Sequence, residues 1–62
     1  MPFINVKMIE GRTTEQKRQL AKALTDAIVE ICGAKREGTM VVIEDHAKED
    51  WAVGGVTIAD RG

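Results

Sequence analysis

Residues 39–44 read Thr-Met-Val-Val-Ile-Glu, and their pattern indicates what kind of sheet the chain can form. Its four consecutive apolar residues leave the segment without a polar face. Strands of this kind lie in sheets that are covered on both sides. We therefore predict a strand whose two faces are both packed against other structure.

The segment before this strand has the pattern of a helix that runs from Thr13 to about Cys32. Thr13 followed three residues later by Gln16 is a capping-box pattern, and Gly33 stands where a left-handed C-terminal residue is expected. The apolar residues recur at spacings of three and four on one face: Leu20, Leu24, Ala27, Ile28 and Ile31. Cys32 lies on or near that face, and we interpret it as a buried small hydrophobe rather than a nucleophile.

A further strand precedes the helix, and residues 10–12 form the turn between them. Residues 3–9 alternate with a period of two: Ile4, Val6 and Met8 against Phe3, Asn5 and Lys7. Strand, helix and strand predict a right-handed β-α-β crossover with parallel strands, an α/β fold. Because one helix covers only one face of the sheet, we expect a second copy of the chain to cover the other.

The length of 62 residues also favours oligomerisation. A single core of this size rarely supplies more than about 3–5 kcal/mol of stability. Such chains are therefore usually stabilised further by a disulfide, a metal ion or oligomerisation. The single cysteine cannot form an internal disulfide, and one cysteine with one histidine cannot close a zinc site. Association of identical chains is the remaining source of stability.

The C-terminal residues 51–58 read as two very short strands that flank a turn at Gly54-Gly55. A hairpin this short is marginal alone, so we expect it to add to a sheet edge, on the same or a neighbouring subunit. Residues 1–62 form one predicted domain without repeats or linkers.

The charge balance narrows the range of partners. Nine Lys+Arg residues against ten Asp+Glu residues lack the basic excess that a nucleic-acid-binding protein needs. The sequence contains no run of about 18 apolar residues, which is the length needed to span a membrane. Its N-terminus does not have the pattern of a secretory signal. We expect a soluble cytoplasmic protein that binds neither nucleic acid nor membrane.

Few residues are candidates for chemistry. The chain has no serine, and adjacent residues in Glu44-Asp45-His46 point to opposite faces of a strand, so we favour a solvated edge over a metal site. Pro2 follows the initiator methionine, and removal of Met1 leaves a secondary amine. An apolar setting lowers the pKa of such an amine toward neutrality, where it acts as a general base. Arg12, beside a helix start, is either an anion-binding residue or a solvent-exposed turn arginine.

These pieces together resemble the 4-oxalocrotonate tautomerase family. The resemblance rests on Met-Pro-Phe-Ile-Asn-Val-Lys at 1–7, on Glu-Gly-Arg-Thr at 10–13 with Glu-Gln-Lys at 15–17, and on Trp-Ala-Val-Gly-Gly at 51–55. It covers essentially the whole chain. It implies a β-α-β subunit assembled as a homohexamer, a trimer of dimers.

The resemblance also implies roles for site residues. Pro2 matches the general base that moves a proton on a small enol or dienol carboxylic acid. Arg12 matches the arginine that binds a substrate carboxylate, typically in a neighbouring subunit's site, and Trp51 matches an aromatic wall. Met40 stands where members acting on 2-hydroxymuconate carry a second arginine, so a monocarboxylate enol, or weak promiscuous tautomerase activity, is favoured over the dicarboxylate dienol. We place Arg36, the nearest arginine, in an extended segment roughly 13 Å from that position.

Three functions follow as hypotheses. The first is a proline-based keto–enol tautomerase that needs no cofactor and no metal. The second is a hydratase or dehalogenase on an unsaturated acid, with Glu44 or Asp45 as the acidic partner. The third is a non-catalytic assembly subunit of the same fold, which Met40 motivates.

Overall fold

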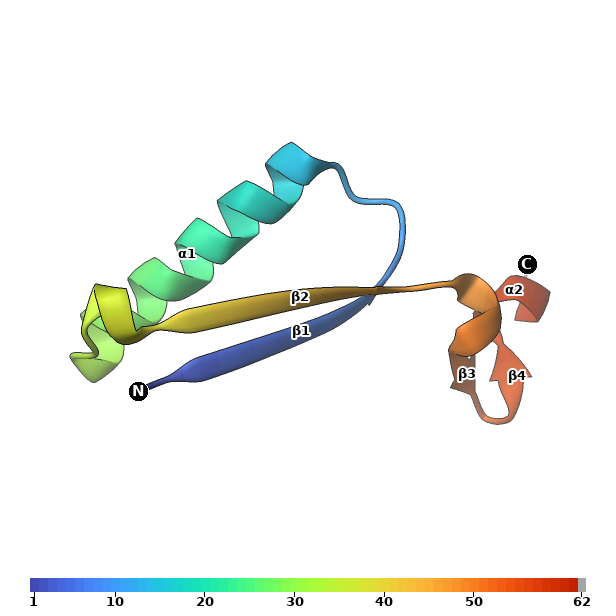
Figure 1. Cartoon of the computed structure of the whole chain (residues 1–62). Helices are drawn as coiled ribbons and strands as arrows, with labels where there is room; N and C mark the ends of the chain where they lie inside the picture. The colour runs from blue at the N-terminus through green and yellow to red at the C-terminus, as the bar shows by residue number, and fades with distance from the viewer. Residues whose placement is uncertain (62) are drawn as a thin grey trace.

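The computed structural model describes residues 1–61, so Gly62, the last residue of the predicted domain, lies outside it. Figure 1 shows the order of the elements along the chain. The regular elements are β1 (Phe3–Ile9), α1 (Thr14–Cys32), β2 (Met40–His46), β3 (Ala52–Val53), β4 (Val56–Thr57) and α2 (Ile58–Arg61). Two short 3₁₀ helices complete the list, η1 (Arg36–Gly38) and η2 (Lys48–Asp50).

The predicted β-α-β unit is confirmed. β1 and β2 are parallel and in register from Phe3 opposite Met40 to Ile9 opposite His46. The capping box of α1 is complete, because Thr13 and Gln16 exchange side-chain and backbone hydrogen bonds of 2.9 and 3.1 Å. Gly33 ends the helix in the left-handed region, with φ of 69°.

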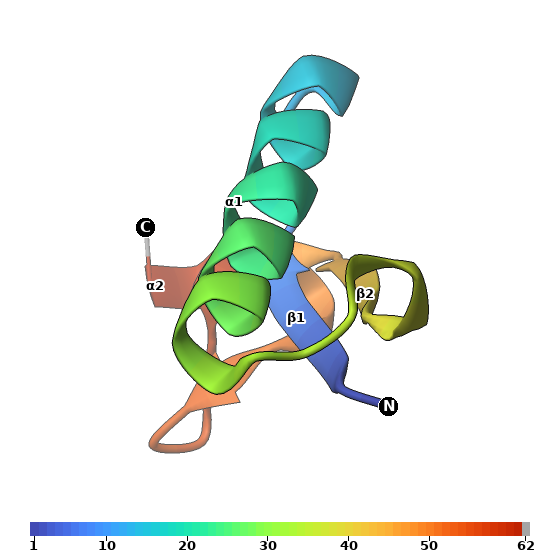
Figure 2. The ribbon, with the colours of Figure 1, turned by 90° about the vertical axis from the view of Figure 1, so that its left-hand side faces the viewer.

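The two faces of the β1–β2 sheet differ. Residues paired across parallel strands share a face, and successive residues alternate between faces. Asp45 of β2 forms an ion pair with Lys17 of α1, so its face is the one that α1 covers. Figure 2, seen from the end that carries the N-terminus, shows α1 lying over the strands. The opposite face carries Phe3 and Val42, which are 58% and 39% exposed.

No side chain in residues 1–61 is fully buried. The chain measures 42 × 24 × 14 Å, and its radius of gyration is 14.6 Å, whereas a compact chain of this length has about 11 Å. We expected β2 to be covered on both faces. Within one chain, only the face toward α1 is covered. The reason is that a single helix is the only layer the chain can place on this sheet.

Two expectations for the end of α1 are wrong within the single chain. Cys32 is exposed rather than buried, and Ile31 on the predicted apolar face is 80% exposed. Two strands about 5 Å apart form a sheet narrower than a helix, which is about 10 Å across. The sheet of one chain is therefore too small to cover the whole apolar face of α1.

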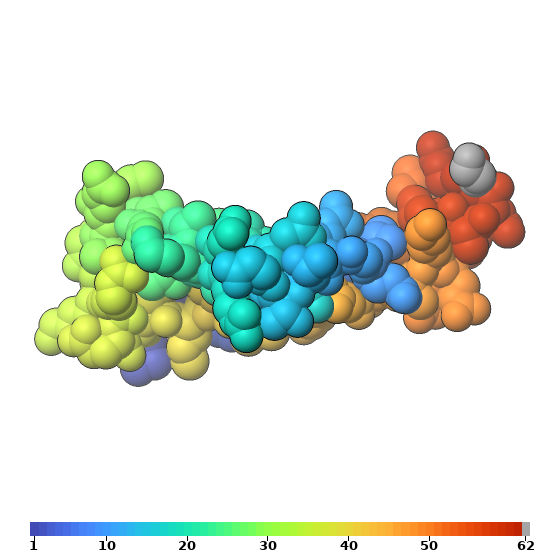
Figure 3. Space-filling view, turned by 90° about the horizontal axis from the view of Figure 1, so that it is seen from above, coloured from blue at the N-terminus to red at the C-terminus, as the bar shows by residue number. Residues whose placement is uncertain are grey.

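The predicted C-terminal hairpin is confirmed, with β3 and β4 antiparallel around Gly54 and Gly55. Within the chain it forms a separate two-stranded sheet and does not join the edge of β1–β2. Figure 3 shows it with α2 as a lobe at one end of the molecule. In the part of the chain that the structure describes, no helix is long and apolar enough to cross a membrane.

Candidate active site

Pro2 and Met40 meet at one end of the sheet. The backbone N–H of Met40 donates to the carbonyl of Pro2 at 3.0 Å, and Phe3 pairs with Met40 at the start of both strands. Pro2 is half-buried, while Met40 is 48% exposed. The start of β2 therefore fixes the backbone of the predicted base.

A cavity of about 280 Å³ borders Pro2. Its lining consists of Met1, Pro2, Ala34, Lys35 and Gly38. While Met1 is attached, the Pro2 nitrogen is an amide and has no basic lone pair. Because Met1 itself lines the cavity, its removal would create the amine at the cavity wall.

Arg12 lies far from Pro2, at the other end of β1. It precedes the helix cap Thr13, and its Nη1 donates to the carbonyl of Ile9 at 3.1 Å. The seven residues of β1 keep Pro2 and Arg12 at least about 20 Å apart. A single chain therefore does not bring the predicted base and the predicted carboxylate ligand together.

Trp51 lies at the same end of the sheet as Arg12. Glu10, two residues before Arg12 in the chain, donates its N–H to the carbonyl of His46 at 2.9 Å. The ring of Trp51 packs edge-on to that of His46, with centroids 5.8 Å apart. The half-buried indole is thus held near the end of β2 that is remote from Pro2.

The acidic residues of β2 form two separate ion pairs. Glu44 accepts from Lys7 at 2.7 Å and from Asn5 at 3.1 Å, and the Lys7 hydrogen bond is the main cause that holds the pKa of Glu44 below its usual range. Asp45 binds Lys17 on the other face, as expected for neighbours in a strand. Within residues 1–61 no three side chains are grouped so that they could hold a metal ion.

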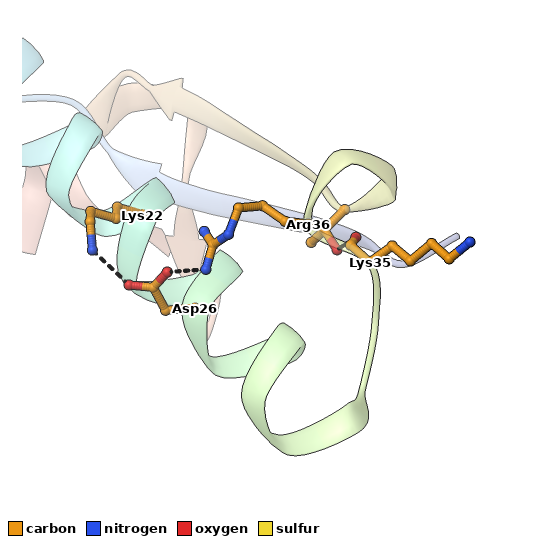
Figure 4. A network of polar contacts seen from close by, with 5 residues as sticks. Lys22, Asp26, Lys35 and Arg36 are labelled. Atoms are coloured by element: carbon orange, nitrogen blue, oxygen red, sulfur yellow. Dashed lines mark hydrogen bonds and ion pairs between the residues drawn. The ribbon is translucent and has the colours of Figure 1, made fainter.

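Arg36 is not in an extended segment, so that expectation is wrong. It begins the 3₁₀ helix η1, and its Nη2 binds Oδ1 of Asp26 at 2.7 Å, while Lys22 binds Oδ2 at 2.8 Å (Figure 4). Hydrogen bonds from Lys22 and then Arg36 lower the pKa of Asp26. The side chain of Arg36 is therefore bound to α1 and does not take the place of the arginine that position 40 lacks.

Sequence reasoning missed Lys35, the one charged side chain in the lining of the Pro2 cavity. The pairing of β1 with β2 points to it. Because β2 starts beside Pro2, the loop that leads into β2 must also pass Pro2. The type of residue alone gave no signal, because most loop lysines are solvated.

Comparison with known proteins gives consistent matches. A family model described as "Tautomerase enzyme" matches residues 2–61. A "Probable tautomerase" of Bacillus cereus is 48% identical over 61 residues, which cover 98% of this chain and 100% of the relative. A "2-hydroxymuconate tautomerase" of Bacillus subtilis is 47% identical over 60 residues, or 97% of each chain.

Solved structures agree with these matches. TomN, described as a 4-oxalocrotonate tautomerase homologue in the tomaymycin biosynthetic pathway, superposes with a TM-score of 0.94 at 38% identity, over 97% of this chain and 92% of that one. A chain of a heterohexamer 4-oxalocrotonate tautomerase from Chloroflexus aurantiacus has a TM-score of 0.91 at 33% identity, over 97% of each chain.

Proposed function

Because the chain belongs to the tautomerase family and is an isomerase, we propose that it is a keto–enol tautomerase with Pro2 as its general base. Removal of Met1 frees the secondary amine of Pro2. The amine takes the proton from the hydroxyl of a small enol or dienol carboxylic acid and returns it to a carbon of the conjugated chain. The bonding electrons move within the substrate, so this step uses no cofactor.

The position of Pro2 is the observation that carries this proposal. Its carbonyl is held by Met40 at 3.0 Å, and the residue forms part of the wall of a cavity. Proton transfer requires a base held within hydrogen-bond reach of the reacting group. A terminal residue that is anchored by its carbonyl leaves its nitrogen free for this role.

The remaining site residues imply a site that is shared between subunits. Arg12 and Trp51 lie at the end of the chain opposite to Pro2, so one copy supplies the base and another the carboxylate ligand and the aromatic wall. The uncovered sheet face with Phe3 and Val42 supports association of copies. We propose a homohexamer, a trimer of dimers, in the cytoplasm. The heterohexamer from Chloroflexus aurantiacus supports this number of subunits.

The substrate class follows from Met40. An apolar side chain beside Pro2 cannot polarise an oxygen, which favours an enol with one carboxylate over a dicarboxylate dienol. The Bacillus subtilis relative carries the name of an enzyme for 2-hydroxymuconate, so both substrate types belong in the test.

The test is ketonisation of phenylenolpyruvate and of 2-hydroxymuconate by chain whose mass shows that it starts at Pro2. Chain that retains Met1 has an amide in place of the amine, and we expect its kcat to be lower by at least about 10²-fold, since a positioned base contributes about 10² to 10⁴. Pro2→Ala replaces the ring nitrogen by an unconstrained primary amine and should also be clearly slower than wild type. An unchanged rate in Pro2→Ala, with the same oligomeric mass, would show that the proposal is wrong.

Of the two alternatives, the hydratase or dehalogenase has no specific observation in its favour, and the non-catalytic subunit has only Met40. A hydratase or dehalogenase needs an acidic partner near the base, but Glu44 and Asp45 are paired with Lys7 and Lys17 toward the remote end of β2. A non-catalytic assembly subunit would give a hexameric mass without turnover of either substrate.

A further inference from the structure

Lys35 has a fixed backbone at the start of η1. Its carbonyl accepts hydrogen bonds from the N–H of Gly38 at 3.1 Å and from Oγ1 of Thr39 at 2.8 Å. The following residue, Arg36, is tied to α1 through Asp26. The loop therefore holds the base of the Lys35 side chain in one place relative to the start of β2.

The ammonium group of Lys35 has no ion pair within residues 1–61. Of the other four lysines in that range, Lys7, Lys17 and Lys22 are each bound to a carboxylate. Figure 4 shows that the side chain of Lys35 extends away from Asp26, the acidic residue labelled in that view. Its positive charge is thus available to a ligand. Lys48 shares this unpaired state but lies by the C-terminal lobe.

Lys35 and Pro2 line the same cavity of about 280 Å³, and no acidic residue lines it. The other side chains of the lining are small or apolar, and Met40 at the start of β2 supplies no charge. An anionic group that reached the Pro2 nitrogen would therefore meet one cation from this chain, the Lys35 ammonium.

We propose that Lys35 binds an oxygen of the substrate's carboxylate or enol group beside Pro2, and this inference rests on the tautomerase function proposed above. A cation there stabilises the negative charge that develops on oxygen as the enol proton leaves. The ligand class is a 2-enol acid, in which the carboxylate and the enol oxygen are neighbours. Phenylenolpyruvate and 2-hydroxymuconate both contain this unit.

The same charge acts on the base. A neighbouring cation disfavours the protonated form of an amine. The acid limb of kcat/KM against pH reports the protonation of the free enzyme's base. Removal of the Lys35 charge should therefore move that limb to higher pH, which a merely structural role of Lys35 would not do.

The experiment compares Lys35→Gln, Lys35→Arg and the control Arg18→Gln, which removes an exposed cation of α1, as processed oligomers that start at Pro2. We expect Lys35→Gln to lower kcat/KM for both substrates by at least about tenfold. Its acid limb should move to higher pH. Lys35→Arg should recover most of the loss, and Arg18→Gln should match wild type in rate and pH profile.

A Lys35→Gln rate within about twofold of wild type, or an equal loss in Arg18→Gln, would overturn the inference. An unshifted acid limb would also overturn it. Pro2→Ala, measured in parallel, separates the two proposals. If Pro2→Ala loses activity while Lys35→Gln keeps it, only the Lys35 inference fails. If Pro2→Ala keeps full activity, both fail.

Discussion

Pro2 and Arg12 flank the same strand, and a strand of seven residues holds them at least about 20 Å apart. Each residue is anchored where it stands. The carbonyl of Pro2 accepts from Met40, and the guanidinium of Arg12 donates to the carbonyl of Ile9. In the proposed function the chain thus carries two half-sites at its two ends, and each half lacks what the other holds.

Arg12→Ala should raise KM for a carboxylate substrate by at least about tenfold and change kcat by less than about threefold. A guanidinium that binds the carboxylate does so equally before and during proton transfer. Steady-state kinetics with phenylenolpyruvate measure both constants. Arg18→Ala, which removes an exposed arginine of α1, is the control. A fall in kcat at constant KM would contradict the role of Arg12 as a carboxylate ligand.

Glu44 predicts a pH dependence of stability. Its pKa lies below the ordinary value of 4.5, mainly because Lys7 donates to it. A carboxyl group with a lowered folded-state pKa stabilises the fold above its unfolded-state pKa, and this contribution disappears as pH falls through the folded-state pKa. The melting temperature of wild type should therefore exceed that of Glu44→Gln at pH 7. The difference should shrink as pH falls below about 4.5.

The control for Glu44 is Glu49→Gln. Glu49 lies exposed in η2 and has no ion pair within residues 1–61. A difference between wild type and Glu44→Gln that stays constant from pH 7 to pH 3 would contradict the assignment.

Helix α1 depends on its N-terminal cap. Thr13 Oγ1 accepts from the N–H of Gln16, and the Gln16 side chain accepts from the N–H of Thr13. Thr13→Ala removes the first of these bonds and should cost about 1 kcal/mol of unfolding free energy. Urea unfolding at one fixed chain concentration measures it. Thr14→Ala, one residue further on and outside the cap, should cost clearly less; equal losses would contradict the capping role.

The strands, the helix and its caps could be predicted because each depends on residues close together in sequence. The alternation in 3–9, the Thr13–Gln16 pair and Gly33 all act locally. The exposure of Cys32 could not be predicted, because it depends on how wide a sheet one chain can build. The turn at η1 could not be predicted either, because it depends on the hydrogen bond from Arg36 to Asp26 in α1.

Candidate site residues follow the same division. Met40 became a candidate through the family resemblance, and the register of the two strands puts it beside Pro2. Lys35 could not be predicted, because its relation to Pro2 appears only once the loop before β2 has a shape.

The whole molecule is flat and open. Its surface area is 4687 Å², whereas a compact protein of 6.8 kDa exposes about 4,000 Å². The excess lies partly on the sheet face opposite α1, where Phe3, Met40 and Val42 are exposed. Packing of copies on this face would supply the core that one chain lacks.

Val42→Asp places a charge on this face and should split the assembly. Burial of an unpaired carboxylate costs several kcal/mol, so the interface would open to keep it hydrated. We expect sedimentation to give a smaller species and the enzyme activity to fall with it. Gln19→Asp, on the exposed surface of α1, should leave the mass unchanged. A hexameric mass for Val42→Asp would show that this face is not an interface.

We propose that one active site takes Pro2 from one subunit and Arg12 from another. Co-refolding equal amounts of Pro2→Ala and Arg12→Ala chains tests it most directly, with kcat/KM for phenylenolpyruvate as the readout. Random mixing should leave about a quarter of the sites with both native residues, and so restore about a quarter of the wild-type activity. If the site lay within one chain, the mixture would show only the average of the two separate variants.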